Sequence, residues 1–252
     1  MGKKYEKNYI SQVIARIDFL SPIVTLNDDI PSKLSIACKQ YFPIPEPKEI
    51  PVHELHLGPS PTEFEKKQTT VREWHFHGVE RNRQLVITQF CMFVIFTRYS
   101  TFDDFRATFA SIVDALYNTY TELQIKRFGL RYINNVEIAG QNRFSWSSYL
   151  NRNLLSIFNV PRDKHKIARA FHNLELNLGD CFLRFQYGMH NPDYPSPIKK
   201  KIFVLDYDAY ITGLLTKDEI NHNLAVLHDE IENMFEISIT EKLRGMMNAA
   251  GQ

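Results

Sequence analysis

The sequence predicts an α+β protein with an extended antiparallel sheet and helices mainly on one face. Several segments alternate apolar and polar residues with the period of a strand, and others carry apolar residues at helical spacing. Short turns separate two pairs of the predicted strands, as antiparallel neighbours allow. The chain has 252 residues with 44% hydrophobic content, which is enough to bury a large core.

The first strand is predicted over residues 13–20, VIARIDFL, because apolar side chains alternate there with the charged Arg16 and Asp18. A helix is expected to follow from the cap candidates Asn27 to Asp29 and to end before Pro43. This strand would present one apolar face and one charged face.

The segment after this helix is rich in proline, since residues 43–61 hold six of the 12 prolines. Proline has no backbone N–H donor, so this density argues against a regular strand ladder. We therefore predict an ordered insertion loop or flap over residues 43–70.

Two strands are predicted next, over residues 72–80 and 84–99, joined as a hairpin. A helix is expected to open at Thr101, and a strand follows over residues 127–138. The resulting order over residues 10–138 is βαββαβ, which is the pattern of a ferredoxin-like unit.

The remaining residues, 139–252, predict the order αβββα, which resembles a partial second copy of the first half. The helices are expected over 145–158 and after a capping box that begins at Thr216. A second capping box at Ser238 predicts a break in the terminal helix. We predict that residues 1–252 form one α+β domain of two halves.

The strand RFGLRYINNVEI raises the question of what two arginines do inside a sheet. Side chains alternate along a strand, so Arg127 and Arg131 should face away from the helices while Phe128 and Tyr132 face them. The same alternation places charged residues of three other predicted strands on the face that is turned away from the helices. The candidate binding residues on that face are Arg16, Asp18, Arg131, Arg184, Asp206 and Asp208.

Two interpretations of this Arg/Asp face stay open. It can be a set of cross-strand ion pairs on a solvated sheet, each contributing about 0.2–1 kcal/mol. It can instead be a polar groove, with Arg131 at its floor and the proline-rich segment as a wall, that binds an anionic ligand or a protein partner. In either case we predict a binding protein and assign no catalytic residue.

One alternative function is a metal-dependent phosphodiesterase or nuclease centred on Asp206 and Asp208. Palm-type enzymes with a related sheet need acids at the central hairpin, where this chain reads Glu80–Arg81–Asn82–Arg83. A second alternative is RNA binding, because KRFGLRYI is partly similar to the signature of RNA-recognition strands. Here Leu130 replaces an expected aromatic residue, so nucleic acid is the less favoured partner.

Composition excludes other classes. The chain carries 30 Lys+Arg against 29 Asp+Glu, which lacks the basic excess typical of strong phosphate binding. Its three cysteines are far apart and suggest neither a disulfide framework nor a zinc knuckle, so we expect a reducing cytoplasm. No segment predicts a signal peptide or membrane span.

The histidines give only local spacing for a metal. Glu73, His75 and His77 share one strand face, and His53 and His56 lie in the proline-rich segment. A metal site needs three or four ligands that converge in space, which this spacing does not establish. We therefore predict no metal and no cofactor.

The C-terminal run LHDEIENMFEISITEKLRGMM and the central run RFGLRYINNVEI resemble a sporadically distributed prokaryotic family of about this length, whose function is uncharacterised. The pattern is a Leu-His pair at Leu227 and His228, then Phe235, then Ile239 and Thr240. The resemblance implies a defence or toxin–antitoxin context and supplies no catalytic residue. From the residues themselves, the apolar members are expected in the core and His228 is expected to cap or bond a carbonyl.

Assembly is a further expectation. A face that mixes Arg and Asp can complement its own copy across a two-fold axis, because each Arg can meet an acid of the other subunit. A homodimer is therefore among the predicted assemblies.

Overall fold

The computed structural model describes residues 5–57, 64–140 and 142–248, with 53–57 and 64–68 described as backbone only. The strands are β1 (Ile10–Phe19), β2 (Ile44–Pro45), β3 (Lys48–Leu57), β4 (Phe64–His77), β5 (Arg83–Ile87), β6 (Cys91–Phe96), β7 (Ile125–Glu137), β8 (Ala170–Asn177), β9 (Phe182–Met189) and β10 (Ile202–Leu215). The α-helices are α1 (Ser32–Tyr41), α2 (Phe102–Thr119), α3 (Lys217–Ser238) and α4 (Glu241–Asn248). The 3₁₀ helices are η1 (Val24–Asn27), η2 (Arg152–Asn159) and η3 (Lys164–Lys166).

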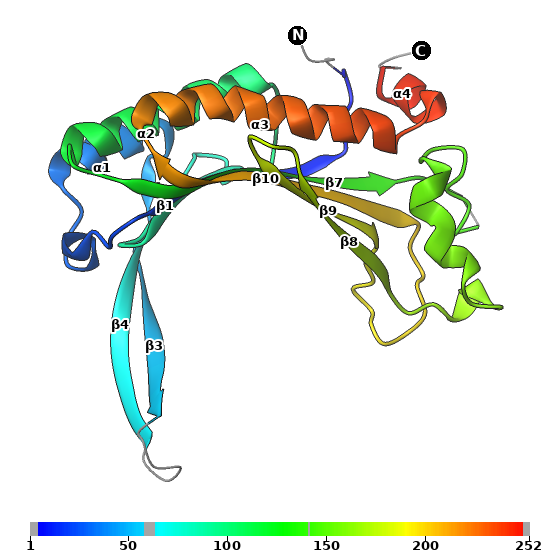
Figure 1. Cartoon of the computed structure of the whole chain (residues 1–252), viewed down its shortest axis with the longest axis horizontal. Helices are drawn as coiled ribbons and strands as arrows, with labels where there is room; N and C mark the ends of the chain where they lie inside the picture. The colour runs from blue at the N-terminus through cyan, green and yellow to red at the C-terminus, as the bar shows by residue number, and fades with distance from the viewer. Residues whose placement is uncertain (1–4, 58–63, 141, 249–252) are drawn as a thin grey trace.

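The described strands form one curved ten-stranded sheet with the order β2-β4-β5-β6-β1-β7-β10-β9-β8, while β3 pairs with β4 alone. Neighbouring strands run antiparallel throughout. Helices α1, α2 and α3 cover the convex side, and no described helix covers the concave side (Figure 1). The predicted α+β class with a large antiparallel sheet is confirmed. None of the helices in the described ranges is long and apolar enough to cross a membrane.

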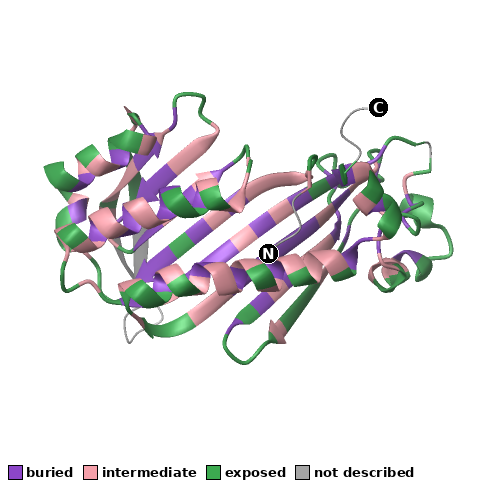
Figure 2. Ribbon diagram, turned by 90° about the horizontal axis from the view of Figure 1, so that it is seen from above, coloured by how far each residue is buried: buried purple, intermediate pink, exposed green. Residues whose placement is uncertain are grey.

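The core lies between the convex side of the sheet and the helices. Buried residues alternate with more accessible ones along much of the central strands (Figure 2), as the pleat requires. Fully buried sheet residues include Val13, Ala15, Ile17, Phe128, Leu130, Leu205 and Tyr207. The helices contribute Phe105, Phe109, Ile112, Leu116, Ile220, Leu224 and Leu227. Each buried Val, Leu, Ile or Phe side chain stabilises the fold by about 1.5–3 kcal/mol.

Two of the predicted helix starts are confirmed by their caps. The Thr101 side chain accepts a hydrogen bond from the backbone N–H of Asp104 at 3.2 Å. Thr216 and Glu219 form the reciprocal capping box at the start of α3. These bonds satisfy backbone donors that a helix N-terminus otherwise leaves free.

The start of the first helix was predicted too early. α1 begins at Ser32 with Pro31 as its N-cap residue, and no side chain caps it. Asn27 belongs instead to η1, where its side-chain oxygen accepts a hydrogen bond from the backbone N–H of Arg72 at 2.9 Å. The side chain of Asn27, which was predicted to cap a helix, therefore connects η1 to β4.

The prediction of a loop without a ladder over residues 43–70 is wrong for the described part. β3 pairs antiparallel with β4 over ten residues, and Pro51 lies opposite Thr70 in that ladder. Among the described strands β3 pairs with β4 alone, so a missing N–H costs less there than in a strand paired on both sides. The two strands form an arm that extends from the sheet (Figure 1). The predicted flap prolines Pro59 and Pro61 lie outside the described residues.

The single strand predicted over residues 84–99 is two strands, β5 and β6, which pair with each other. Between them the Thr88 side-chain oxygen accepts hydrogen bonds from the backbone N–H groups of Phe90 and Cys91, both at 3.1 Å. This local bonding closes a turn inside a run that is otherwise strand-like.

The second half also departs in part from its prediction. Residues 152–159 form the 3₁₀ helix η2 where an α-helix was expected over 145–158. β8, β9 and β10 then form a meander, and the turn after β8 contains Gly179 with a positive φ of 90°. The predicted break near Ser238 is confirmed, because α3 ends there and α4 starts at Glu241. The Ser238 hydroxyl donates to the Met234 carbonyl of its own helix at 2.7 Å.

We predict that Gly188→Ala destabilises the fold more than Gly213→Ala. Both glycines have positive φ values, 149° and 132°, so an alanine at either position costs about 1–3 kcal/mol of backbone strain. Only at Gly188 would the added Cβ also overlap the carbonyl oxygen of Ala170 in β8. Urea unfolding of both variants measures the difference. Equal losses would show that β8 moves aside freely.

We also predict that most tyrosines of the folded protein resist ionisation at pH 10.5. Burial raises the pKa of Tyr99 to about 12 and raises the pKa of other tyrosines as well. The affected tyrosines are Tyr5, Tyr9, Tyr99, Tyr117, Tyr120, Tyr132, Tyr187 and Tyr207, out of 12 in the chain.

The sign follows from proton binding in the two states. Above the ordinary pKa of 10 the unfolded chain loses tyrosine protons that the folded chain keeps, so stability falls as the pH rises. Absorbance at 295 nm, compared between folded and urea-unfolded protein at pH 10.5, counts the ionised tyrosines. Equal ionisation in both states would contradict the predicted burial.

Candidate functional site on the concave sheet face

The site is built by four adjacent central strands, β1, β7, β10 and β9. The register places Asp208 of β10 opposite both Arg131 of β7 and Arg184 of β9. On the other side of β7, Asp18 of β1 lies opposite Arg127. Directly opposed residues point to the same face of a sheet, so all of these side chains lie on the concave side.

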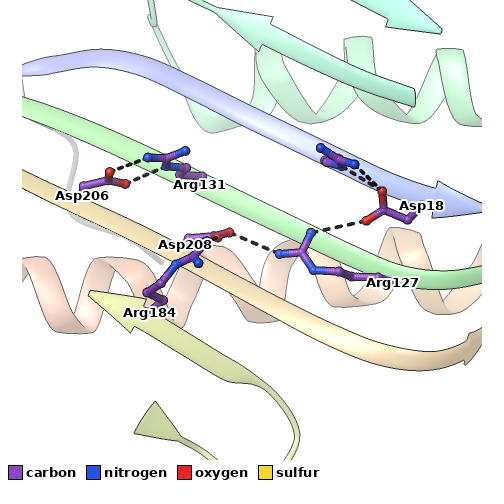
Figure 3. Close-up of polar contacts among 7 residues, drawn as sticks. Asp18, Arg127, Arg131, Arg184, Asp206 and Asp208 are labelled. Atoms are coloured by element: carbon purple, nitrogen blue, oxygen red, sulfur yellow. Dashed lines mark hydrogen bonds and ion pairs between the residues drawn. The ribbon is translucent and has the colours of Figure 1, made fainter. Parts of the chain in front are cut away.

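Arg131 forms a two-point ion pair with Asp206. Its Nε donates to Asp206 Oδ1 at 2.8 Å and its Nη2 donates to Asp206 Oδ2 at 2.6 Å (Figure 3). The guanidinium thus turns diagonally toward Asp206 and away from Asp208, its register partner. These hydrogen bonds raise the pKa of Arg131 above its ordinary value, so its guanidinium group is charged throughout the physiological range.

The other five residues form a continuous chain of alternating charge across the strands. Arg16 donates from Nε to Asp18 at 2.8 Å, and Arg127 Nη1 lies 3.6 Å from the second oxygen of Asp18. Arg127 Nη2 lies 3.7 Å from Asp208, which also accepts a hydrogen bond from Arg184. Asp18 and Asp208 therefore each have two guanidinium partners (Figure 3).

The acids and the bases are not equally exposed. The Asp18, Asp206 and Asp208 side chains are 13%, 10% and 11% exposed, whereas the exposed fractions of the Arg side chains range from 26% for Arg127 to 50% for Arg16. The carboxylates thus form a lower layer and the guanidinium groups an upper one. Each of these nearly buried acids has at least one guanidinium partner, so the acids hold the arginines in place.

These side chains surround a hollow of about 470 Å³. Its lining comprises Ile14, Arg16, Asp18, Phe93, Ile95, Arg127, Gly129, Arg131, Arg184 and Asp208. A Cβ at Gly129 would lie 3.2 Å from Arg127 Nη1, so the glycine leaves room for that guanidinium. Arg127 also lies over the Tyr210 ring at 4.6 Å, and Phe182 stacks on Tyr210.

The structure brings all six sequence-predicted residues onto one face. Asp206 supports Arg131 and does not line the hollow. Arg127, which the predicted site left out, is central because it joins the two halves of the charge chain. Strand parity alone had placed Arg127 on this face, and that signal could have added it. None of the described residues that line the hollow comes from the proline-rich segment 43–70, so the described part of that segment is not its wall.

The acids predicted for phosphodiester chemistry are already engaged. Asp206 accepts two hydrogen bonds from Arg131, and Asp208 accepts one from Arg184. Neither belongs, within the described part of the chain, to a group of three metal-ligating side chains. The arrangement favours ion pairing over metal binding at these two residues.

The histidines of β4 lie next to polar side chains of the same sheet region. His75 Nε2 lies 2.7 Å from Glu73 and His75 Nδ1 lies 2.8 Å from the Gln84 amide nitrogen. His77 Nε2 lies 3.3 Å from Glu46. The side chains of His53 and His56 lie outside the described residues.

The C-terminal residues that carry the family resemblance lie on the other side of the sheet. Leu227 and Ile231 are buried, and Phe235 packs against the core. His228 was expected to bond a carbonyl but instead its Nδ1 lies 3.2 Å from the hydroxyl of Tyr132. A search against protein-family models gives no match to the chain, and a search of curated proteins gives none.

We predict that Arg131→Gln costs more stability than Arg16→Gln. Without Arg131, the buried Asp206 loses the partner of both its hydrogen bonds, which costs on the order of 2–4 kcal/mol. Without Arg16, Asp18 keeps Arg127, so we expect a loss below about 1 kcal/mol.

Urea unfolding at pH 7 measures both losses. The single variant Asp206→Asn and the double variant Arg131→Gln/Asp206→Asn test the cause of the loss at Arg131. The second substitution should restore part of the stability, because it removes the unpaired charge. A double variant as unstable as the sum of the two single variants would show that the pair is not coupled.

Proposed function

We propose that the chain is a binding protein whose concave face binds an acidic segment of a protein partner. The observation that carries the proposal is the two-layer arrangement, with four partly exposed arginines held above three nearly buried aspartates. Arginine matches a carboxylate with two parallel N–H donors, and a fixed guanidinium loses little entropy on binding.

The charge balance supports an acidic protein segment over nucleic acid. The layer carries four arginines against three aspartates, and the whole chain carries 30 basic against 29 acidic side chains. Binding of nucleic acid draws mainly on a large basic excess. A protein segment with a few carboxylates better matches the small local excess of positive charge.

Three finer expectations belong to the same proposal. The first half is proposed to be a ferredoxin-like unit, which the sheet order β5-β6-β1-β7 with the helices α1 and α2 supports. Membership of the uncharacterised prokaryotic family rests on the sequence resemblance. A reducing, cytoplasmic setting is supported by the buried free cysteines Cys38, Cys91 and Cys181. The partial second copy and the homodimer stay predictions.

We predict that Arg127→Gln weakens the binding of an acidic peptide without unfolding the protein. Asp18 keeps Arg16 and Asp208 keeps Arg184 in this variant, so no buried acid is left unpaired. The hollow nevertheless loses one guanidinium, and we expect at least about tenfold weaker binding for the loss of a charged hydrogen bond.

The measurement is fluorescence anisotropy with a labelled peptide of alternating Asp and Gly, and with labelled oligothymidylate as a second probe. The charge-matched control is Arg98→Gln. The Arg98 side chain follows β6 in the chain, is 78% exposed and does not line the hollow. Binding that neither variant changes, or that both weaken equally, would refute a specific site. Tighter binding of the oligonucleotide would replace the protein partner by single-stranded nucleic acid.

A further inference from the structure

A second hollow, of about 580 Å³, lies on the helix side of the sheet. It opens between the start of α2, the middle of α3 and the strand β7. Its lining includes Tyr99, Phe102, Tyr132, His228, Asp229 and Glu232. Hollows of a few hundred Å³ that combine aromatic walls with a few convergent polar groups are typical of ligand sites. The concave-face proposal makes no use of these residues.

Three metal-ligating side chains converge at this hollow. One ring nitrogen of His228 and one carboxylate oxygen each of Asp229 and Glu232 all lie within 4.8 Å of one another. His228 and Glu232 are four residues apart on α3, so they share one side of the helix. Asp103 at the start of α2 lines the same hollow and adds negative charge. Within the described lining no residue is Lys or Arg.

The His228 ring is held in one orientation by its neighbours. It stacks on Phe102 with ring centres 3.8 Å apart and planes inclined by 7°. Its Nδ1 lies 3.2 Å from the Tyr132 hydroxyl, and that hydroxyl donates to Tyr99 at 3.3 Å. A tyrosine hydroxyl has one proton to donate, so Nδ1 of His228 is the donor to Tyr132. Nε2 then keeps a free lone pair for a ligand.

We propose that His228, Asp229 and Glu232 form a site for a divalent transition-metal ion, with His228 binding through Nε2. A ligating histidine usually donates its other ring N–H to an oxygen, and Tyr132 is placed for that role. One imidazole with two carboxylates suits Mn²⁺, Fe²⁺, Co²⁺ or Zn²⁺ better than Mg²⁺ or Ca²⁺, which favour oxygen ligands alone. Three protein ligands leave coordination positions for water or a small molecule from the hollow.

The test uses the full-length protein without an affinity tag, freed of metal by a chelator and dialysed against Zn²⁺, Mn²⁺, Co²⁺ or Mg²⁺. We expect one bound Zn²⁺, Mn²⁺ or Co²⁺ per chain and a Co²⁺ absorption spectrum in the visible range, with weaker binding of Mg²⁺. Asp229→Asn and Glu232→Gln should each lower the affinity at least tenfold. His222→Gln is a control for loss of a histidine elsewhere on the same helix, because His222 is exposed and lies outside the cluster.

Two outcomes would overturn the proposal. The first is the absence of stoichiometric binding for all three transition metals. The second is binding that survives both carboxylate substitutions or that falls with His222→Gln. Melting curves of the metal-free variants show whether any loss of metal binding comes from unfolding. Because Asp229 is exposed, we expect Asp229→Asn to leave the melting temperature of the metal-free protein unchanged.

Tyr132 is a positioning residue in this proposal, and Tyr132→Phe separates that role from packing. The substitution keeps the buried ring and removes only the hydroxyl. We expect about tenfold weaker metal binding and a changed ¹⁵N chemical shift of the His228 ring nitrogens, which report the tautomer. A lower melting temperature with unchanged metal affinity and unchanged shifts would show that Tyr132 only packs.

Discussion

The pairing of β7 with β1 on one side and with β10 on the other holds the two halves of the chain in one sheet. β7 comes from the first half and β10 from the second, and the two strands pair over most of their length. A shift of this register by one residue would turn every side chain of β7 to the opposite face. The burial of Phe128, Leu130 and Tyr132 under the helices therefore specifies the register, and with it the position of Arg127 and Arg131.

The concave face follows from that pairing. Its acids come from β1 and β10, and its arginines come from β1, β7 and β9, so neither half of the chain contains the whole set. The aspartates are nearly buried because the neighbouring arginines lie over them. A carboxylate in such a place needs a permanent partner, and this requirement orients the guanidinium groups without any ligand. The arginines are thus arranged before binding, which lowers the entropy that binding has to overcome.

Both proposed sites meet at two consecutive residues of β7. Arg131 points to the concave face and bonds Asp206, while Tyr132 points to the helices and bonds His228. One site therefore depends on ion pairs between strands and the other on contacts from the sheet to α3. The strand that joins them is internal to the sheet and cannot tilt without breaking hydrogen bonds on both sides.

The amino-acid sequence by itself determined the α+β class, the faces of the central strands and the caps at Thr101 and Thr216. These features depend on alternation and on bonds between residues that are near in the chain. The turn at Thr88 was missed because its run of apolar residues continues on both sides. The β3 ladder was missed because proline content argues against strands in general and does not reveal that a strand has a single neighbour.

Only the tertiary structure decided which charges pair and which residues meet across the core. Parity placed Arg131 among three acids, but the choice of Asp206 over its register partner Asp208 depends on the twist and spacing of β7 and β10. Tyr132 and His228 are 96 residues apart in the chain and meet only where α3 crosses β7. Local patterns specify the face on which a side chain lies, whereas its partner on that face depends on how distant elements pack.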